Sequence, residues 1–345
     1  MFINLENQVA LVTGASRGIG QSIALSLGKQ KAFVIGTATT EDGAQKISAF
    51  LKEQNIAGKG IKLDVNDNEA ILKTVDDIIK EHGPESVGIY VSGQLLTEDY
   101  YVFNKLMKGL IGSNNIDTNS RLCMSSAVAG YKQTLGMDAP PCCYEDIDSA
   151  STIFITGSNT AFAHPILYRR LEDARKNNPD LKVIVVDPRK TDTAKEADLY
   201  LQIQPGTDVA LYYGMLYIML WEKWIDESYI NSYTEDFDAL RDLVRDFTPK
   251  AVSQICGIKE KDLFQAAQWF ATSPATLSMY CQGLNQSASG TAKNAALVNL
   301  HLATGQIGKA GAGPFSLTGQ PNAMGGREVG GLANLLSAHR DLANP

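Results

Sequence analysis

Thr152 to Thr160, TIFITGSNT, is a short apolar run that enters a Gly-Ser-Asn turn. Such a run predicts a buried strand of a parallel sheet. The residues after it, HPILYRRLEDARKN, have the spacing of an amphipathic helix. A strand, a polar turn and a helix in this order predict one unit of an α/β fold.

The same order repeats in the next part of the chain. Leu181 to Leu211, LKVIVVDPRKTDTAKEADLYLQIQPGTDVAL, supplies two more strand–turn pairs, and a long helix is expected to continue through Trp224. This alternation predicts a mostly parallel α/β domain.

Polar residues follow the predicted strands where each strand ends. They are Ser158 and Asn159, then Asp187 and Arg189, then Gly206 to Asp208. Ligands of doubly wound sheets bind at the carboxyl ends of the strands, although such residues are also ordinary turn formers. Their recurrence at successive strand ends favours a binding surface.

Composition limits the class of protein. The 345 residues carry a formal net charge of −7, which argues against a nucleic-acid binder or a protein held to an anionic membrane. No apolar run approaches the roughly 20 residues that span a bilayer. The start, MFINLENQVALVTGAS, has no basic region before an apolar core, so we expect a cytoplasmic location. The five cysteines contain no Cys-x-x-Cys pair, so no iron–sulfur cluster ligands are expected in this chain.

One of these cysteines stands in a distinctive stretch. Asn114 to Gly130, NNIDTNSRLCMSSAVAG, is a polar turn with Arg121 and Cys123, followed by small residues that predict the start of a helix. A cysteine alone is most often a small buried apolar residue. It is also a soft ligand for a metal, and the nearby Arg121 favours its thiolate form.

The N-terminal part has a different pattern. Gln8 to Val12 predicts a buried strand, Thr13 to Gly20 (TGASRGIG) a glycine turn, and the residues after it a helix. This is the context of a dinucleotide-binding turn, in which Gly14 allows the tight turn, Gly18 the approach of a pyrophosphate and Gly20 close helix packing.

The next strand, AFVIGTA, ends without an acidic residue for a ribose hydroxyl. Ser16, Arg17 and Thr37 suit a 2′-phosphate instead, which favours NADP over NAD. The predicted NADP-binding residues are Gly14, Ser16, Arg17, Gly18, Ile19, Gly20, Thr37 and Asp64.

On TGASRGIG, Thr37 and the Leu-Asp-Val that follows Lys62, the first 83 residues resemble the start of a short-chain dehydrogenase/reductase, most closely a 3-oxoacyl-[acyl-carrier-protein] reductase. A Tyr-x-x-x-Lys pair, Tyr101 and Lys105, comes too soon after the fourth strand for that family. Without that tyrosine as proton donor, ketone reduction is not expected.

The last third contains a glycine-rich tract, ATGQIGKAGAGPFSLTGQPNAMGGREVGG. Such a tract is too polar and flexible to pack against itself. We expect it to wrap a large polar ligand whose phosphates accept backbone N–H groups; a disordered tail is the alternative.

Residues 84–345 resemble the molybdopterin oxidoreductases, specifically nitrate reductases of the assimilatory and periplasmic type. The resemblance rests on GPESVGIYVSGQLLTEDYY, NNIDTNSRLCMSSAVAG, TGSNTAFAHPILYRR, VVDPRKTDTAKEADLYLQIQPGTD, GLNQ and GQPNAMGGREVGG. It implies that Cys123 ligates molybdenum, that Gln320, Met324 and Arg327 lie near the metal, and that Arg327 attracts nitrate. It implies a bis-molybdopterin guanine dinucleotide lined by Gly157, Ser158, Asn159, Asp187, Arg189, Gly206, Thr207, Asp208, Gly283 and Asn285.

The sequence therefore predicts a chimera. Residues 1–83 form a partial, Rossmann-like βαβαβ unit, and residues 84–345 a second, mostly parallel α/β domain of molybdopterin-oxidoreductase type. The leading hypothesis is reduction of nitrate to nitrite at molybdenum, with an electron-donor protein as partner. The iron–sulfur segment and the C-terminal domain of that family are expected to be absent. The alternatives are an NADP-dependent 3-oxoacyl reductase remnant and an inactive nucleotide-binding chimera.

Overall fold

The computed structural model describes residues 4–138, 140–340 and 342. The chain divides into two compact units, one formed by Met1–Asn119 with Asn322–Pro345 and the other by Ser120–Pro321. The predicted domain boundary after Gly83 falls inside the first unit. It stays a prediction of where the two family segments of the sequence join.

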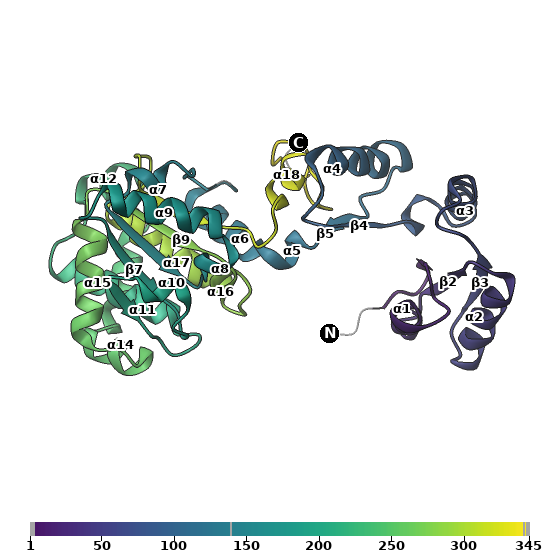
Figure 1. Ribbon diagram of the computed structural model, residues 1–345, viewed down its shortest axis with the longest axis horizontal. Coiled ribbons are helices and arrows are strands. Elements are labelled where there is room, and N and C mark those ends of the chain that lie inside the picture. Colours follow the sequence, from purple (N-terminus) through teal and green to yellow (C-terminus); the bar gives the residue numbers. More distant parts are fainter. Residues whose placement is uncertain (1–3, 139, 341, 343–345) are drawn as a thin grey trace. The chain divides into compact units, whose positions relative to one another are not determined.

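The first unit begins with a parallel sheet in strand order β1-β2-β3 (Figure 1). Its strands are β1 (Val9–Val12), β2 (Phe33–Ala38) and β3 (Gly58–Lys62), and its helices are α1 (Gly18–Lys29), α2 (Glu41–Glu53) and α3 (Asn68–His82). Val34, Ile47 and Leu51 belong to its buried core. This βαβαβ arrangement confirms the predicted Rossmann-like start.

The remainder of the first unit is built on a separate pair of parallel strands, β4 (Ile89–Val91) and β5 (Ile116–Thr118). Around them lie η1 (Pro84–Ser86), α4 (Thr97–Asn104), a π-helix η2 (Lys105–Ile111) and α18 (Ala323–Glu328). Within the described residues, β4 pairs with β5 and not with β1. The change of sequence pattern after Gly83 therefore coincides with a change of sheet.

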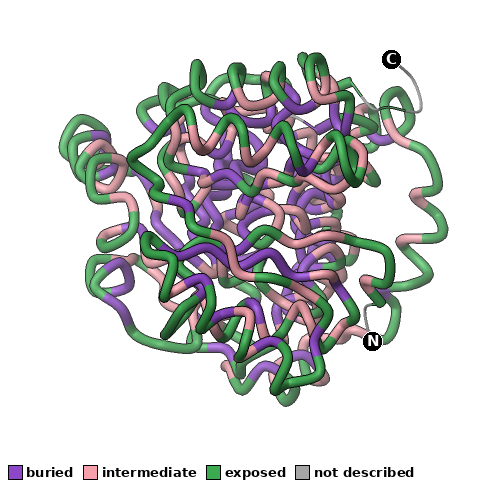
Figure 2. The backbone as a smooth tube through the Cα atoms, turned by 90° about the vertical axis from the view of Figure 1, so that its right-hand side faces the viewer, coloured by how far each residue is buried: buried purple, intermediate pink, exposed green. Residues whose placement is uncertain are grey.

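The second unit contains a parallel sheet with strand order β10-β9-β6-β7-β8 in the described part of the chain. Its strands are β6 (Thr152–Thr156), β7 (Lys182–Val186), β8 (Leu199–Leu201), β9 (Thr276–Tyr280) and β10 (Gly313–Ser316). All residues of β6, β9 and β10 are buried. Figure 2 colours the backbone by burial and shows buried segments enclosed by exposed ones. Because these strands are covered on both faces, their polar residues, such as Thr276 and Ser278 of β9, are buried as well.

Helices cover both faces of this sheet. Ile153 and Ile155 of β6 pack into a cluster with Ile147 of α7 (Asp146–Ser149) and Leu171 of α9 (Pro165–Asn177). On the opposite face, the ring of Phe154 lies 5.5 Å from the ring of Phe270 on α15 (Glu260–Thr272). Alternate residues of one strand thus serve two separate helical layers.

Some helices of the second unit precede its first strand and the others follow its strands. They are α5 (Ser120–Cys123), α6 (Ser125–Leu135), α7 (Asp146–Ser149), α8 (Thr160–Ala163), α9 (Pro165–Asn177), α10 (Asp192–Lys195), α11 (Asp208–Trp221), α12 (Glu227–Tyr233), α13 (Phe237–Leu243), η3 (Val244–Asp246), α14 (Pro249–Cys256), α15 (Glu260–Thr272), α16 (Gln282–Asn285) and α17 (Gly290–Ala303). None of the described helices has both the length and the apolar character needed to cross a membrane.

Two sequence predictions about elements were wrong. The predicted helix through Trp224 ends at Trp221. The glycine-rich tract is not one ligand-wrapping loop, because Gly313–Ser316 forms β10 beside β9 and Ala323–Glu328 forms α18. Pairing with a buried neighbouring strand overrides the weak strand propensity of glycine and proline.

The buried imidazole of His301 predicts a pH dependence of stability. Its Nε2 lies 2.7 Å from Ser278 Oγ, and burial lowers the pKa of His301 from 6.5 to about 3. The unfolded chain binds a proton at His301 below about pH 6.5 and the folded chain does not, so stability falls as the pH decreases through this window. We expect His301 to contribute up to about 1.4 kcal/mol of lost stability per pH unit.

Urea unfolding at pH 7 and pH 5 measures this effect. His301→Gln keeps a polar group toward Ser278 but does not titrate, so its stability should change less between the two pH values. His82→Gln is the control, because the His82 side chain is 25% exposed. An unchanged pH dependence in His301→Gln would show that His301 is not the titrating group.

Candidate functional site

A pocket of about 510 Å³ opens at the carboxyl ends of the strands in the second unit. Its lining comes from the turns after β6, β7, β8 and β9 and from α17. The lining residues are Gly157, Asn159, Asp187, Pro188, Arg189, Pro205, Gly206, Asp208, Gln282, Gly283, Gln286, Ser287 and Lys293.

Sheet topology explains why a pocket forms there. From β6 the chain passes to β7 and β8 on one side, whereas β9 and β10 lie on the other side of β6. The chain beyond β6 and the chain beyond β9 therefore continue toward opposite edges of the sheet. In open α/β sheets, ligands bind in the crevice at such a switch point.

Two glycines on these turns make direct backbone contact. Gly157 has a positive φ of +57°, and the N–H of Gly283 donates to the Gly157 carbonyl at 2.9 Å. A Cβ on Gly283 would lie 2.5 Å from the Cα of Gly157, closer than real Cβ atoms approach other atoms. The absence of both side chains is therefore what brings the turns after β6 and β9 together.

Seven of the ten residues predicted to hold the dinucleotide line this pocket. They are Gly157, Asn159, Asp187, Arg189, Gly206, Asp208 and Gly283. These residues belong to four separate segments of the sequence. The parallel strands bring the four segments to one edge of the sheet. Asp187 and Asp208 supply carboxylate acceptors, and Arg189 supplies a guanidinium donor.

The other three predicted residues do not contribute to the pocket lining. The Ser158 hydroxyl lies 3.0 Å from that of Thr160, and the Thr207 hydroxyl donates to the Gln204 carbonyl. Asn285 is buried and donates to Ser316 Oγ at 3.2 Å. Their side chains stabilise the turns that carry the lining residues.

Sequence reasoning missed Lys293, which lines the same pocket. Its ammonium group pairs with the Asp208 carboxylate at 2.7 Å, and the two side chains are only 5% and 9% exposed. Lys293 also donates to the Gly283 carbonyl at 3.3 Å. The feature of the sequence that could have identified Lys293 is its helical spacing. Lys293 lies on the buried stripe of α17 together with Leu297 and Leu300.

Cys123 ends the short helix α5 and is 4% exposed. Its sulfur accepts from the Gln282 side-chain amide at 2.9 Å and from the Gly319 backbone N–H at 3.3 Å. The Gln282 carbonyl oxygen in turn accepts from the Cys281 thiol at 2.6 Å, and burial raises the pKa of Cys281 to about 12. The Cys123 sulfur is thus an acceptor for two N–H groups.

The helix after Cys123 is held by close packing. In α6, Gly130 faces α17, where a Cβ would lie 2.6 Å from the Cβ of Asn294. The small-residue run predicted to start a helix does form α6, and its small side chains allow the two helices to approach.

The other residues predicted near the metal fall in both units. Gln320 belongs to the second unit, where its backbone carbonyl accepts from the Thr318 hydroxyl. Met324 and Arg327 belong to the first unit and lie on α18. Arg327 is 1% exposed, and its Nη1 lies 3.2 Å from the Met324 sulfur.

The predicted NADP turn has the backbone that its glycines suggested. Gly14 and Gly18 have φ values of +64° and +59°, and a Cβ on Gly20 would lie 2.4 Å from the Gly14 carbonyl oxygen. Ser16, Arg17 and Asp64 are exposed, whereas Thr37 is buried and its carbonyl accepts from the N–H of Ala15.

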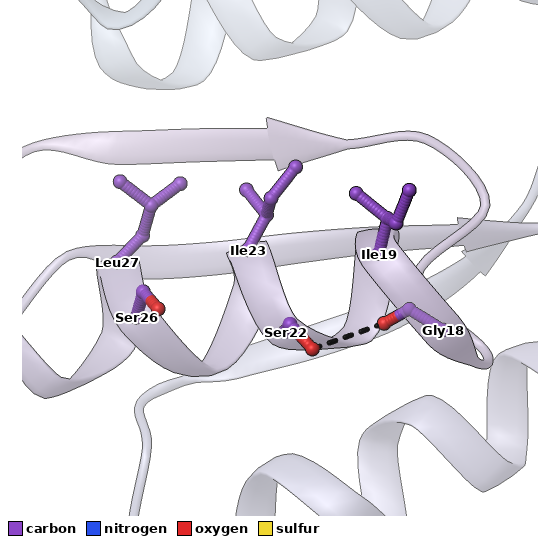
Figure 3. Close-up of a pocket in the computed structure, with 6 residues that line it drawn as sticks. All are labelled: Gly18, Ile19, Ser22, Ile23, Ser26 and Leu27. Carbon is purple, nitrogen blue, oxygen red and sulfur yellow. Dashed lines mark hydrogen bonds between the residues drawn. The ribbon is translucent and has the colours of Figure 1, made fainter.

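A pocket beside this turn is apolar and lies along α1. It has a volume of about 530 Å³ and includes Gly18 and Ile19 of the predicted NADP residues. Ile19, Ile23 and Leu27 project from one side of the helix at successive turns (Figure 3). This lining offers few polar partners for phosphates, so the pocket differs in character from the polar pocket of the second unit.

Two further predictions concern catalytic and metal groups. Tyr101 and Lys105 lie on adjacent turns of one continuous helical segment, and the Lys105 ammonium is 5.8 Å from the centre of the Tyr101 ring. Among residues 4–138, 140–340 and 342, no group of three or more His, Cys, Asp or Glu side chains is arranged to hold a metal ion.

Comparison with known families identifies two segments. Residues 68–343 match the family model described as molybdopterin oxidoreductase, and residues 8–96 match the model described as short chain dehydrogenase. The two matches overlap at residues 68–96, which contain the predicted boundary after Gly83.

Individual relatives support the larger match. The chain is 50% identical over 279 residues to a nitrate reductase from Synechocystis sp., covering 80% of this chain and 39% of the relative. It is 49% identical over 263 residues to a nitrate reductase from Klebsiella oxytoca, covering 76% of this chain and 30% of the relative. The chain therefore spans less than half the length of these relatives.

A solved structure has a similar fold. Acetylene hydratase from Pelobacter acetylenicus superposes with a TM-score of 0.63 at 25% identity, covering 73% of this chain and 34% of that protein.

Proposed function

Because the chain belongs to the molybdopterin oxidoreductase family, we propose that its second unit binds a molybdenum bis-molybdopterin guanine dinucleotide and serves the reduction of nitrate to nitrite. A molybdenum–pterin cofactor is the general feature of this family; the bis-dinucleotide form is our proposal for this chain. The observation that carries it is the polar pocket at the switch point of the sheet, together with a buried cysteine sulfur that accepts two N–H groups.

The pocket residues fit a nucleotide. The carboxylates of Asp187 and Asp208 suit the N–H donors of a guanine base, and Arg189 suits a phosphate. Gly157 and Gly206 carry no side chain, so a pyrophosphate can approach the backbone of these two turns closely. The lining contains two acidic and two basic side chains, so these charges cancel. Binding of a polyanionic ligand therefore depends on where the basic side chains lie in the pocket and not on an excess of positive charge.

Cys123 is the proposed molybdenum ligand. A thiolate is a soft donor, and hydrogen bonds to a metal-bound sulfur tune the reduction potential of the centre. The Gln282 amide and the Gly319 N–H are placed to make such bonds in this chain. When bound, the metal centre supplies the oxygen-atom transfer from nitrate.

The substrate-guiding role is assigned to Gln320, Met324 and Arg327. An oxyanion needs a cation to enter an acidic protein, and the Arg327 guanidinium provides one. The proposal also includes an electron-donor protein as a partner and a cytoplasmic location for the chain.

A second proposal concerns the N-terminal segment. The match of residues 8–96 to the short chain dehydrogenase model and the positive φ angles of Gly14 and Gly18 support binding of NADP at the glycine turn. Residues Ser16 and Arg17 would contact the 2′-phosphate. Titration of the full chain with NADPH, read by protection against thermal unfolding, tests this proposal, and equal protection by NADH would remove its preference for the phosphate.

Metal and nucleotide analysis tests the main proposal. The full chain and Cys123→Ser are purified from a host that makes the molybdenum cofactor. We expect about one molybdenum and two guanine nucleotides per wild-type chain, and at least a tenfold loss of molybdenum in Cys123→Ser. Cys256→Ser, which changes another buried cysteine, is the control. Wild-type protein without molybdenum and without guanine nucleotide would exclude the proposed function for this chain.

A further inference from the structure

We infer that Lys293 is a positioning residue that holds Asp208 for recognition of a purine with adjacent N–H donors. This inference rests on the proposed function, because it concerns the same pocket. It adds a residue that neither the sequence motifs nor the family resemblance singled out.

Lys293 joins three parts of the pocket. Its ammonium group lies 2.7 Å from Oδ2 of Asp208, the first residue of α11, and 3.3 Å from the carbonyl of Gly283 on α16. Lys293 itself lies on α17. One side chain therefore fixes the turn after β8 against the turn after β9.

Folding stability alone does not account for this pair. Both side chains are almost fully removed from water, and desolvating two charges costs about as much as their attraction returns. An apolar pair of similar volume is often equally stable or more stable. A buried charge pair at the wall of a pocket is instead explained by what the pocket binds.

The geometry defines the chemical class of ligand. Lys293 contacts Oδ2, which fixes the direction of the carboxylate and leaves Oδ1 to accept from a ligand. Guanine presents adjacent N–H donors to such an acceptor, whereas adenine presents a ring-nitrogen acceptor at the equivalent position. A fixed carboxylate therefore favours guanine and repels adenine.

The test measures nucleotide binding by the full chain. The protein is purified from a host that lacks molybdenum-cofactor synthesis, and GDP and ADP are titrated by calorimetry. We expect Lys293→Met to raise the Kd for GDP at least tenfold and to lower the preference for GDP over ADP. Lys293→Arg should restore part of both. Lys250→Met, an exposed position on α14, is the matched control and should bind as the wild type does.

A double variant separates positioning from folding. In Lys293→Met with Asp208→Leu, no charge is left unpaired, so the midpoint of thermal unfolding should return close to that of the wild type. Selective GDP binding should stay lost. If the double variant recovered both stability and GDP selectivity, the pair would be purely structural and the inference would be wrong.

Two further results separate this inference from the proposed function. Normal GDP affinity and selectivity in folded Lys293→Met would overturn this inference and leave the proposed function intact. Wild-type protein that binds neither GDP nor molybdenum would overturn both.

Discussion

Gly283→Ala is expected to lower the stability of the second unit by about 3 kcal/mol, the upper end of the usual cost of overpacking, because the new Cβ would clash with backbone atoms. The new Cβ would meet the Cα of Gly157 at 2.5 Å and its carbonyl oxygen at 2.7 Å. No side-chain rotation relieves a clash with backbone atoms. The midpoint of thermal unfolding should fall by roughly 6–12 °C for a unit of this size.

Gly206→Ala is the matched control for this substitution. Gly206 lines the same pocket and has a φ of +86°, but a Cβ there meets nothing within 4 Å. Its cost should be backbone strain alone, about 1 kcal/mol. Calorimetry of both variants measures the difference. Equal losses would mean that the contact between Gly157 and Gly283 is not the source of the effect.

Much of the second sheet was predictable because its strands are buried on both faces. The run at Thr152–Thr156 and the run at Lys182–Val186 contain few polar residues, and each ends at a turn. Their parallel pairing then brings distant turns to one edge, which is why seven predicted residues share a pocket. The local pattern was sufficient here because each turn needed to be recognised only in its own segment.

Features that depend on tertiary partners were not predictable. β10, Gly313–Ser316, is a strand because β9 pairs with it, and nothing in its glycine-rich sequence indicates this. Lys293 is buried because Asp208 neutralises it from another helix. Helical spacing places Lys293 on the same stripe as Leu297 and Leu300, but the carboxylate that allows a charge to be buried there comes from a distant segment.

The change of family along the chain was visible in both sequence and structure. The glycine turn at Thr13–Gly20 belongs to the β1-β2-β3 sheet, whereas β4 pairs with β5 in a different sheet. The two family matches overlap between residues 68 and 96, so α3 (Asn68–His82) is shared by both.

Phe270→Ala is expected to have the other large effect, a loss of about 3–5 kcal/mol. Phe270 is fully buried on α15, with its ring 5.5 Å from Phe154 and 4.9 Å from His301. It fills the layer between the sheet and its helices, and truncation leaves a cavity that the surrounding helices cannot close. Urea unfolding measures the loss. Phe264→Ala on the same helix is the control, because Phe264 is 38% exposed and its cost should be about 1 kcal/mol.

The same substitution should also change the pH dependence of stability. The low pKa of His301 arises mainly from burial, and Phe270 is one of the groups that exclude water from its ring. A cavity beside the imidazole brings water closer and lets the charged form exist in the folded state. The stability of Phe270→Ala should therefore change less between pH 7 and pH 5 than that of the wild type, whereas Phe264→Ala should keep the wild-type dependence. If Phe270→Ala kept the full dependence, burial by Phe270 would not be what holds His301 neutral.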